Sequence, residues 1–438
     1  MDVLGRYSHI KGFCYMQSNT RNNIAFWREY DEQIVERDLD YAQRLGLNSA
    51  RVFLSYVVWE REPEAFVARL RHFIRAGHER GISTMPVLWD CCDYAVEMTF
   101  FQPTYECDLD EWIGNPGTDR LGPDFYPQGE RYITDVVGSL AGEPGLELWD
   151  VMNEPLGTPW ARPDGWAGEV DPERAQVIWD FVHHFCGVVK KVDPVTPITV
   201  CCGPYDVPIE VPVVTEGELA LVEVPPVPNL EQTADHVDVL AFHNYSPTRE
   251  HMRASIRRAA EIGEQAGKPI LISEMSCFAR TNPYDMSIEV CNEQGIGFYF
   301  WELMIGVNRW SEIHGLVYPD GTVRDPAAVL AILGFFRKRD EGAVKPRVDR
   351  ENHIWAALTL AREWLADAEA DYEEGLERLE RMANLLEGGE LIAMFDLPTA
   401  RVAALRGAGE TPESRQELGA LMASWGEALE PYRESSAA

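Results

Sequence analysis

The sequence predicts an α/β protein, a (β/α)₈ TIM barrel with a C-terminal α-helical appendage, on the strength of three observations. Between about residues 8 and 338, short apolar runs alternate with amphipathic stretches, the rhythm of repeated βα units. Several of the short runs are apolar throughout, as expected for parallel strands that are covered on both faces. From Glu351 onward the chain is rich in Ala, Leu and Glu and carries few strand signals.

The short apolar runs predict eight strands, the number that closes a barrel. In chain order they lie near residues 9–15, 49–54, 83–89, 147–152, 198–202, 237–242, 270–273 and 297–300.

Three of the intervening segments carry clear helical periodicity. Residues 31–45, 172–192 and 249–265 place apolar side chains three or four positions apart, which is the pattern of a helix that covers a sheet. The third segment is followed by Gly267, a residue that commonly ends helices, and Pro269 then opens the next strand.

Two connections are long, residues 90–125 after the third strand and residues 203–235 after the fifth. Loops that follow barrel strands lie on the C-terminal face, where active sites are found. The first loop contains aromatic residues that would either line a cleft or fix the loop in place: Tyr94, Phe100, Phe101, Tyr105 and Trp112.

The predicted domain boundary lies where the composition changes, near Pro346. Residues 1–345 are predicted to form the catalytic barrel, and residues 346–438 a helical extension. An apolar stripe on the extension must pack either on the barrel or on a second subunit, so a homodimer through these helices is one of the two expectations: Leu376, Leu379, Ala383 and Leu386.

The charge of the chain restricts its partners. Lys and Arg total 39 residues against 72 Asp and Glu, which gives a formal net charge of −33. Such an acidic protein repels phosphate backbones and anionic lipids, so neither nucleic acid nor a membrane is an expected partner. A neutral carbohydrate remains compatible with this charge.

The sequence offers no signal for export, metal or cofactor. No hydrophobic leader and no membrane-length apolar run are visible, so a cytoplasmic location is expected. The nine cysteines include no C-x-x-C pair, which favours buried reduced thiols over a zinc site. The H-E-x-x-H, P-loop, G-x-S-x-G and Rossmann patterns are also missing from the sequence, and no cofactor or metal is predicted.

Two glutamates close predicted strands. Residues 148–155 read LWDVMNEP, so Glu154 stands where the fourth strand meets its loop, and residues 269–274 read PILISE, so Glu274 ends the seventh. Both carboxylates would then enter the same mouth of the barrel. Cleavage of a glycosidic bond needs such a pair, one carboxyl protonated and one ionised. Taken singly, each glutamate would more often be a salt-bridge partner or a helix cap.

With these motifs, residues 8–338 resemble the clan A glycoside hydrolases, and within that clan most closely the cellulase-like family five. The resemblance implies that Glu154 is the acid/base and Glu274 the nucleophile. It further implies that Asn153 binds the 2-hydroxyl of the sugar.

Four more positions match the family. The resemblance implies that Arg51, at the end of NSAR in the second strand, hydrogen-bonds the nucleophile. It implies that His243 and Tyr245, in FHNY after the sixth strand, contact substrate and nucleophile. Trp301, at the end of the eighth strand, would be the platform under the sugar.

The third strand departs from the family. Family members commonly carry a histidine near its end, whereas this chain has Trp89 and Asp90. Both are predicted to support substrate binding. Asp90 would either hydrogen-bond sugar hydroxyls or cap the following turn, and the departure bears on specificity more than on chemistry.

The sequence thus favours a retaining β-glycoside hydrolase that acts on oligosaccharides or small glycosides by double displacement through a glycosyl-enzyme intermediate. Two alternatives stay open. A transglycosidase would use the same two glutamates, and a catalytically silent sugar-binding barrel would keep the fold alone.

Overall fold

The computed structural model describes residues 2–92, 103–158, 160–161, 170–202, 209–215, 218–224, 229–246, 248–276, 282–335, 347–366, 371–388 and 400–430. The chain divides into two compact units. The first comprises Met1–Ile209, Glu223–Cys277 and Asn282–Arg337, and the second comprises Glu210–Val222, Phe278–Thr281 and Lys338–Ala438.

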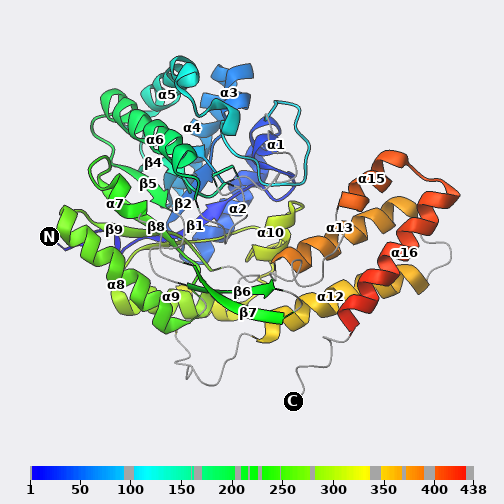
Figure 1. Cartoon of the computed structure of the whole chain (residues 1–438). Coiled ribbons are helices and arrows are strands. Elements are labelled where there is room, and N and C mark those ends of the chain that lie inside the picture. The colour runs from blue at the N-terminus through cyan, green and yellow to red at the C-terminus, as the bar shows by residue number, and fades with distance from the viewer. Residues whose placement is uncertain are drawn as a thin grey trace. The chain divides into compact units, whose positions relative to one another are not determined.

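Eight parallel strands of the first unit close into a barrel in the order β1-β10-β9-β8-β5-β4-β3-β2, and helices surround it (Figure 1). The predicted (β/α)₈ barrel is therefore confirmed, and each of the eight predicted segments contributes one strand. The strands are β1 Lys11–Tyr15, β2 Ser49–Phe53, β3 Ser83–Asp90, β4 Trp149–Asn153, β5 Ile198–Cys202, β8 Val239–Asn244, β9 Ile270–Met275 and β10 Phe298–Phe300.

The helices of the first unit follow the strands in the βα rhythm. They are α1 Asn23–Arg28, α2 Glu32–Arg44, α3 Tyr56–Arg61, α4 Pro63–Glu79, α5 Tyr126–Leu140, α6 Pro172–Val192, α7 Asn229–Thr233, α8 Arg249–Ala266, α9 Tyr284–Gln294, α10 Arg309–His314 and α11 Pro326–Ile332. Short 3₁₀ turns lie at Gly5–Tyr7, Thr118–Arg120 and Pro123–Phe125.

The three helices predicted from periodicity begin and end where local chemistry dictates. The side chain of Asp31 caps α2 by accepting hydrogen bonds from two backbone amides, and Asp171 does the same for α6. Thr248 caps α8, which ends at Gly267 in the left-handed conformation that glycine adopts without steric cost. Caps of this kind satisfy amides that have no partner inside the helix.

Apolar side chains fill the interior of the barrel, as expected for a (β/α)₈ fold. One buried cluster joins residues from several strands: Tyr7, Ile10, Met85, Leu148, Cys201, Val239, Ala241, Leu271 and Tyr299. The Ser49 and Tyr299 hydroxyls inside the barrel pair with each other at 2.7 Å. Charged groups gather instead at the carboxyl ends of the strands.

The second long loop contains regular structure that the sequence did not predict. Strands β6 Ile209–Thr215 and β7 Glu218–Val224 pair as a two-stranded sheet, and α7 follows. Both strands are rich in valine, a residue that favours strands. The Pro-rich run at 224–228 concealed this signal, because proline is disfavoured within a sheet.

The predicted C-terminal helices are present as α12 Arg347–Ala366, α13 Tyr372–Gly388, α15 Ala400–Ala408 and α16 Pro412–Leu429. They share a core of their own: Ile354, Ala357, Leu358, Ala361, Trp364, Tyr372, Leu376, Leu379, Met382, Val402, Leu405, Leu418, Leu421, Met422, Trp425 and Leu429. Three residues of the predicted apolar stripe belong to this core or pack against it: Leu376, Leu379 and Ala383. Packing on the barrel or on a second subunit remains a prediction.

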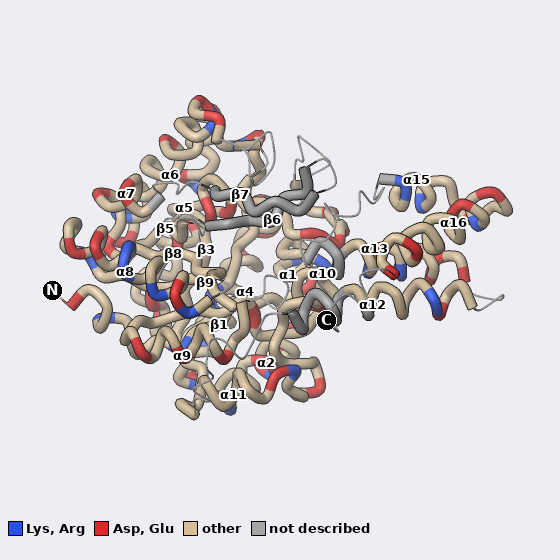
Figure 2. Tube along the Cα trace, turned by 60° about the horizontal axis from the view of Figure 1, so that its bottom comes forward, with Lys and Arg blue, Asp and Glu red and all other residues tan. Residues whose placement is uncertain are grey.

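Acidic residues are spread over helices of both units, among them α2, α8 and α13 (Figure 2). The cysteines that the structure describes are buried. Across the described ranges, every helix is too short or too polar to span a bilayer.

Candidate active site

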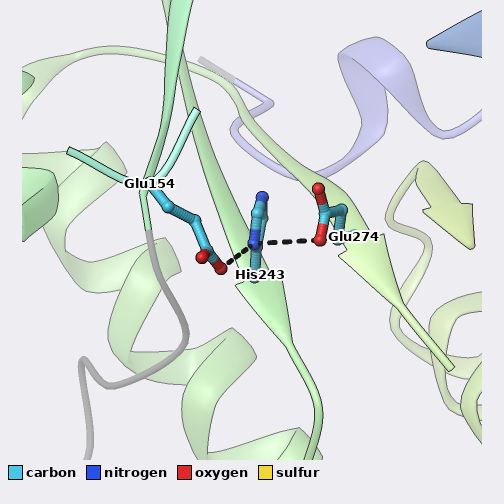
Figure 3. Close-up of side chains that lie close together, drawn as sticks. All are labelled: Glu154, His243 and Glu274. Carbon is cyan, nitrogen blue, oxygen red and sulfur yellow. Dashed lines mark hydrogen bonds and ion pairs between the residues drawn. The ribbon is translucent and has the colours of Figure 1, made fainter. Parts of the chain in front are cut away.

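Two carboxylates and one imidazole meet at the carboxyl ends of the barrel strands (Figure 3). Glu154 follows β4 directly, His243 belongs to β8 and Glu274 to β9. A carboxylate oxygen from each glutamate and a ring nitrogen of His243 all lie within 4.8 Å of one another. The structure thus brings together the two glutamates singled out in the sequence.

The backbone at Glu154 is held in an uncommon conformation, with φ at 41°. Positive φ in a residue other than glycine costs free energy and occurs where the surroundings enforce it, often at functional sites. The Glu154 amide donates to the Cys201 carbonyl at 2.8 Å, and the Gly157 amide donates to the Glu154 carbonyl at 2.8 Å. A Cβ atom at Gly157 would come within 2.7 Å of Glu154 Oε2, so this glycine leaves room for the carboxylate.

His243 lies between the two glutamates. Its Nδ1 is 2.7 Å from Glu154 Oε1 and 3.3 Å from Glu274 Oε2. Its Nε2 is buried and has no hydrogen-bond partner within the described part of the chain. Because Nδ1 faces two acceptors, we assign the ring proton to that nitrogen.

Glu274 is surrounded by donors on both of its oxygens. An Arg51 Nη1 group donates to Oε1, and the Tyr245 hydroxyl donates to Oε2 at 2.7 Å. The Glu274 side chain is only 7% exposed. Both carboxylate oxygens of Glu274 are therefore held in place by hydrogen bonds, the one from Arg51 being charge-assisted.

The guanidinium of Arg51 is completely buried and is shared by several partners. Two of its nitrogens donate to Asp150 Oδ2, at 3.1 and 2.7 Å, and Nη2 also donates to Asn153 Oδ1 at 2.6 Å. The ring of Phe53 lies 4.6 Å from Cζ of Arg51. Asp150 and Glu274 together compensate the buried charge, as a buried cation requires.

Asp90 ends β3 and is 3% exposed. It accepts hydrogen bonds from Asn153 Nδ2 at 2.8 Å, from Trp112 Nε1 at 2.7 Å and from the Cys92 amide at 2.9 Å. Burial raises the pKa of Asp90 well above its usual value, and these three hydrogen bonds act in the opposite direction. The bond to Cys92 shows that Asp90 caps the following turn, one of its two predicted roles.

Trp301 follows β10 and is half-buried. Its ring makes edge contacts with Phe53, at a centroid distance of 5.7 Å, and with Trp112, at 4.9 Å. The Tyr284 hydroxyl donates to the Trp301 carbonyl at 2.6 Å. The partly exposed ring is therefore held from several sides, as a fixed apolar platform would be.

The prediction that Trp89 supports substrate binding is wrong. Its side chain has no exposed surface and packs against Tyr132 of α5 and against Phe181 and Phe185 of α6. Successive residues of a strand point to opposite faces, so Asp90 enters the barrel mouth whereas Trp89 faces the helices. Trp89 is a core residue.

Two residues of the site escaped sequence reasoning: Asp150 pairs with Arg51, and Gly157 leaves space for Glu154. Trp112 was expected to line a cleft or fix the loop, but its contact with Asp90 was not predicted. Asp150 carried a usable signal, because a charged residue within an apolar strand run requires a buried partner. Trp112 lies 22 positions from Asp90, and no sequence pattern predicts that contact.

The described part of the long loop after β3 is fixed to α1. Asn22 Nδ2 donates to the carbonyls of Cys107 and Leu109, and Asn23 Nδ2 donates to that of Ile113. The Tyr105 hydroxyl donates to Glu62 at 2.7 Å, so this aromatic ring fixes the loop in place. Three other predicted loop aromatics lie outside the described residues: Tyr94, Phe100 and Phe101.

Glu154, His243 and Glu274 also form a group whose atoms are close enough to hold a metal ion. Both oxygens of Glu274 already accept from Arg51 and Tyr245, and the cationic guanidinium would repel an ion bound there. The donor set therefore fits proton transfer and nucleophilic chemistry better than metal binding.

Comparison with known proteins yields structural neighbours only. No protein-family model matches the sequence, and no curated protein matches it. A variant of GH5_18 from Streptomyces cattleya in complex with Manβ1-4GlcNAc is similar, with 16% identity over 76% of this chain and 82% of that chain and a TM-score of 0.54.

Two further solved structures are similar at the same level. GH5_18 from Streptomyces cattleya in complex with GlcNAc shares 17% identity over 76% of this chain and 82% of that chain, with a TM-score of 0.51. The exo-β-1,4-mannosidase Op5Man5 from Opitutaceae bacterium strain TAV5 shares 18% identity over 82% of this chain and 68% of that chain, with a TM-score of 0.51. At these identities, the likeness shows the barrel fold alone.

Proposed function

We propose that this chain is a retaining β-glycoside hydrolase with Glu154 as acid/base and Glu274 as nucleophile. The observation that carries the proposal is the pair of carboxylates at the ends of β4 and β9, which bring one oxygen each within 4.8 Å of the other. Retaining glycosidases separate their two carboxyl groups by about 5–5.5 Å, whereas inverting enzymes leave about 6.5–9.5 Å for a water molecule.

The different surroundings of the two glutamates support their different roles. Arg51 and Tyr245 stabilise the charge of Glu274, which suits the group that attacks the anomeric carbon and forms the glycosyl ester. Glu154 contacts the His243 ring at 2.7 Å and lies in a buried position, which suits the group that gives a proton to the leaving oxygen. In the second step Glu154 takes a proton from the water that hydrolyses the ester.

The proposed substrates are oligosaccharides or small glycosides with a β-linked sugar. A neutral sugar is compatible with the net charge of −33, and Trp301 offers a partly exposed apolar ring to a pyranose face. The structural neighbours suggest which sugar to test first, because they include a β-1,4-mannosidase and a complex with Manβ1-4GlcNAc.

Turnover of aryl β-glycosides of mannose, glucose, galactose and xylose tests the proposal. We expect hydrolysis of at least one, with the first-formed sugar in the β configuration by NMR. Replacement of Glu274 by Ala or Gln should lower kcat by about 10⁴-fold or more, as found when nucleophiles are removed. An α-configured first product, or full activity after Glu274→Gln, would contradict the proposal.

A second measurement separates the two glutamates. Azide is a small nucleophile that needs no general base, so it should restore turnover of an activated aryl glycoside to Glu154→Ala and yield a β-glycosyl azide. The same addition to Glu274→Ala should yield the α-azide, because azide then attacks the opposite face. Sugar binding without turnover would instead indicate a silent barrel, and transfer to an added sugar acceptor a transglycosidase.

A further inference from the structure

Five side chains beside the nucleophile form a closed ring of contacts. Arg51 donates to Asn153 at 2.6 Å, and Asn153 donates to Asp90 at 2.8 Å. Trp112 donates to the other oxygen of Asp90 at 2.7 Å and meets the Phe53 ring at a centroid distance of 4.7 Å. Phe53 closes the ring, since its face lies 4.6 Å from Cζ of Arg51.

The Asp90 carboxylate accepts hydrogen bonds from three N–H groups. Oδ1 accepts from Asn153 and from the Cys92 amide, and Oδ2 accepts from Trp112. With 3% of its surface exposed, Asp90 is placed to bind these three N–H groups rather than a sugar hydroxyl.

Asp90 and Arg51 together orient the Asn153 amide. Its oxygen faces the Arg51 guanidinium and its nitrogen faces the Asp90 carboxylate. In the reverse orientation the amide NH₂ would face the guanidinium donors and the amide oxygen would face the carboxylate acceptor. Arg51 in turn donates to Glu274. The carboxylate of Asp90 therefore influences the nucleophile through two intervening side chains.

On its other side Asp90 reaches the aromatic platform. Trp112 is 4% exposed and its ring stands at 73° to that of Trp301, with centroids 4.9 Å apart. The hydrogen bond to Asp90 fixes the direction of the indole, and Trp112 then limits where the Trp301 ring can lie.

We propose that Asp90 is a positioning residue for the glycosidase reaction, acting through Asn153 on the nucleophile and through Trp112 on the sugar platform. The inference rests on the proposed function. One buried carboxylate connects the part of the site that reacts with the part that binds.

The test uses the full chain and compares four variants by kcat, KM and thermal unfolding on the best aryl glycoside. Asp90→Asn keeps the shape but offers one acceptor oxygen to three donors. Trp112→Phe removes the indole donor and keeps a ring, and the double variant carries both changes. Asp38→Asn is the matched control, because Asp38 is a buried carboxylate in α2 that accepts from Tyr15 and Arg37.

We expect Asp90→Asn to lower kcat about tenfold to a hundredfold, since a buried donor facing the reacting groups loses its acceptor. Trp112→Phe should raise KM about threefold to tenfold and change kcat by less than about twofold. The double variant should lose less than the product of the two single effects, because both changes break the same hydrogen bond. Asp38→Asn should leave kcat and KM unchanged.

Several results would overturn the inference alone. If the wild-type chain is active, equal kinetic effects of Asp90→Asn and Asp38→Asn would be one such result. A second would be a rise of KM without a fall of kcat in Asp90→Asn. A third would be a double variant whose loss equals the product of the two single effects. If Asp90→Asn fails to fold, Trp112→Phe decides, and an unchanged KM overturns the inference. A wild-type chain without turnover on any glycoside overturns the proposed function and the inference with it.

Discussion

At the scale of single residues, most charged side chains of the site are buried and lie close to a partner. Glu302 differs, because one of its carboxyl oxygens, Oε1, has no hydrogen-bond partner within the described residues. It follows Trp301 and is 1% exposed. Burial raises the pKa of Glu302 to about 8, a contact with Ser311 lowers it, and the charge of Glu274 raises it. Glu302 is therefore protonated at neutral pH in the folded chain.

This gives a pH-dependent prediction for stability. The folded chain keeps a proton on Glu302 that the unfolded chain loses near pH 4.5. The free energy of unfolding therefore includes the full contribution of protonated Glu302 below pH 4.5, and this contribution is lost as pH rises toward 8. Glu302→Gln removes this dependence. As pH rises from 4.5 to 7, the free energy of unfolding of the variant should increase by about 3 kcal/mol relative to that of the wild type.

Urea unfolding at several pH values measures this difference. Glu79→Gln, at an exposed position of α4, is the control and should run parallel to wild type. A difference between Glu302→Gln and wild type that stays constant with pH would show that Glu302 is ionised in the folded chain.

At the scale of elements, the ends of helices are set by caps that the sequence displays. Asp171 Oδ1 accepts from the amides of Glu173 and Arg174, at 3.0 and 3.1 Å, at the start of α6. This helix lies against β4 and β5 and supplies Phe181 and Phe185 to the packing around Trp89. The helix therefore supports the strand that Glu154 follows.

Asp171→Ala should lower the free energy of unfolding by about 1 kcal/mol, the usual cost of losing an N-cap. Thermal or urea unfolding measures the loss, and kcat should stay within about twofold because the contacts of the Asp171 side chain within the described residues are with the first turn of α6. Thr248→Ala, which removes the cap of α8, is a matched comparison. A loss of less than a few tenths of a kcal/mol would mean that water replaces the Asp171 carboxylate.

Elements also show how far the sequence predicts this fold. All eight barrel strands were predicted, because strands covered on both faces form apolar runs that end abruptly. The β6–β7 pair was missed beside a proline run, and Trp89 was placed in the mouth although it packs on helices. A strand reverses its faces with each residue, so an assignment displaced by one position moves a side chain from the mouth to the core.

The candidate site was predictable to the extent that its residues close strands. Glu154 and Glu274 could be placed in this way, and the structure brings them together with His243. The links made by Asp150 and Trp112 depend on contacts between distant segments, at 99 positions from Arg51 and 22 from Asp90. Local patterns carry no information about such contacts.

At the scale of the whole molecule, each of the two units has its own core. The C-terminal helices share a buried cluster that includes Leu379, whereas the barrel encloses another that includes Leu148. Separate cores permit separate unfolding transitions.

Leu379→Ala should destabilise the C-terminal unit by about 2–5 kcal/mol through the cavity it leaves, while kcat on an aryl glycoside stays unchanged. Leu148→Ala, an equal truncation in the barrel, should lower the melting temperature of the active unit instead. Calorimetry combined with residual activity during heating distinguishes the two. A single transition shifted by both variants would show that the units unfold together.

The arrangement around Arg51 also bears on how this site can change over time. Its guanidinium contacts Glu274, Asp150 and Asn153, all buried, so replacing any one of them leaves a charge or donor unbalanced. Single substitutions are costly, whereas simultaneous replacement by apolar residues is not. Related barrels that have lost catalytic activity should therefore lack Arg51 and its three partners as a group. Redesign of the pocket should likewise replace all four residues together.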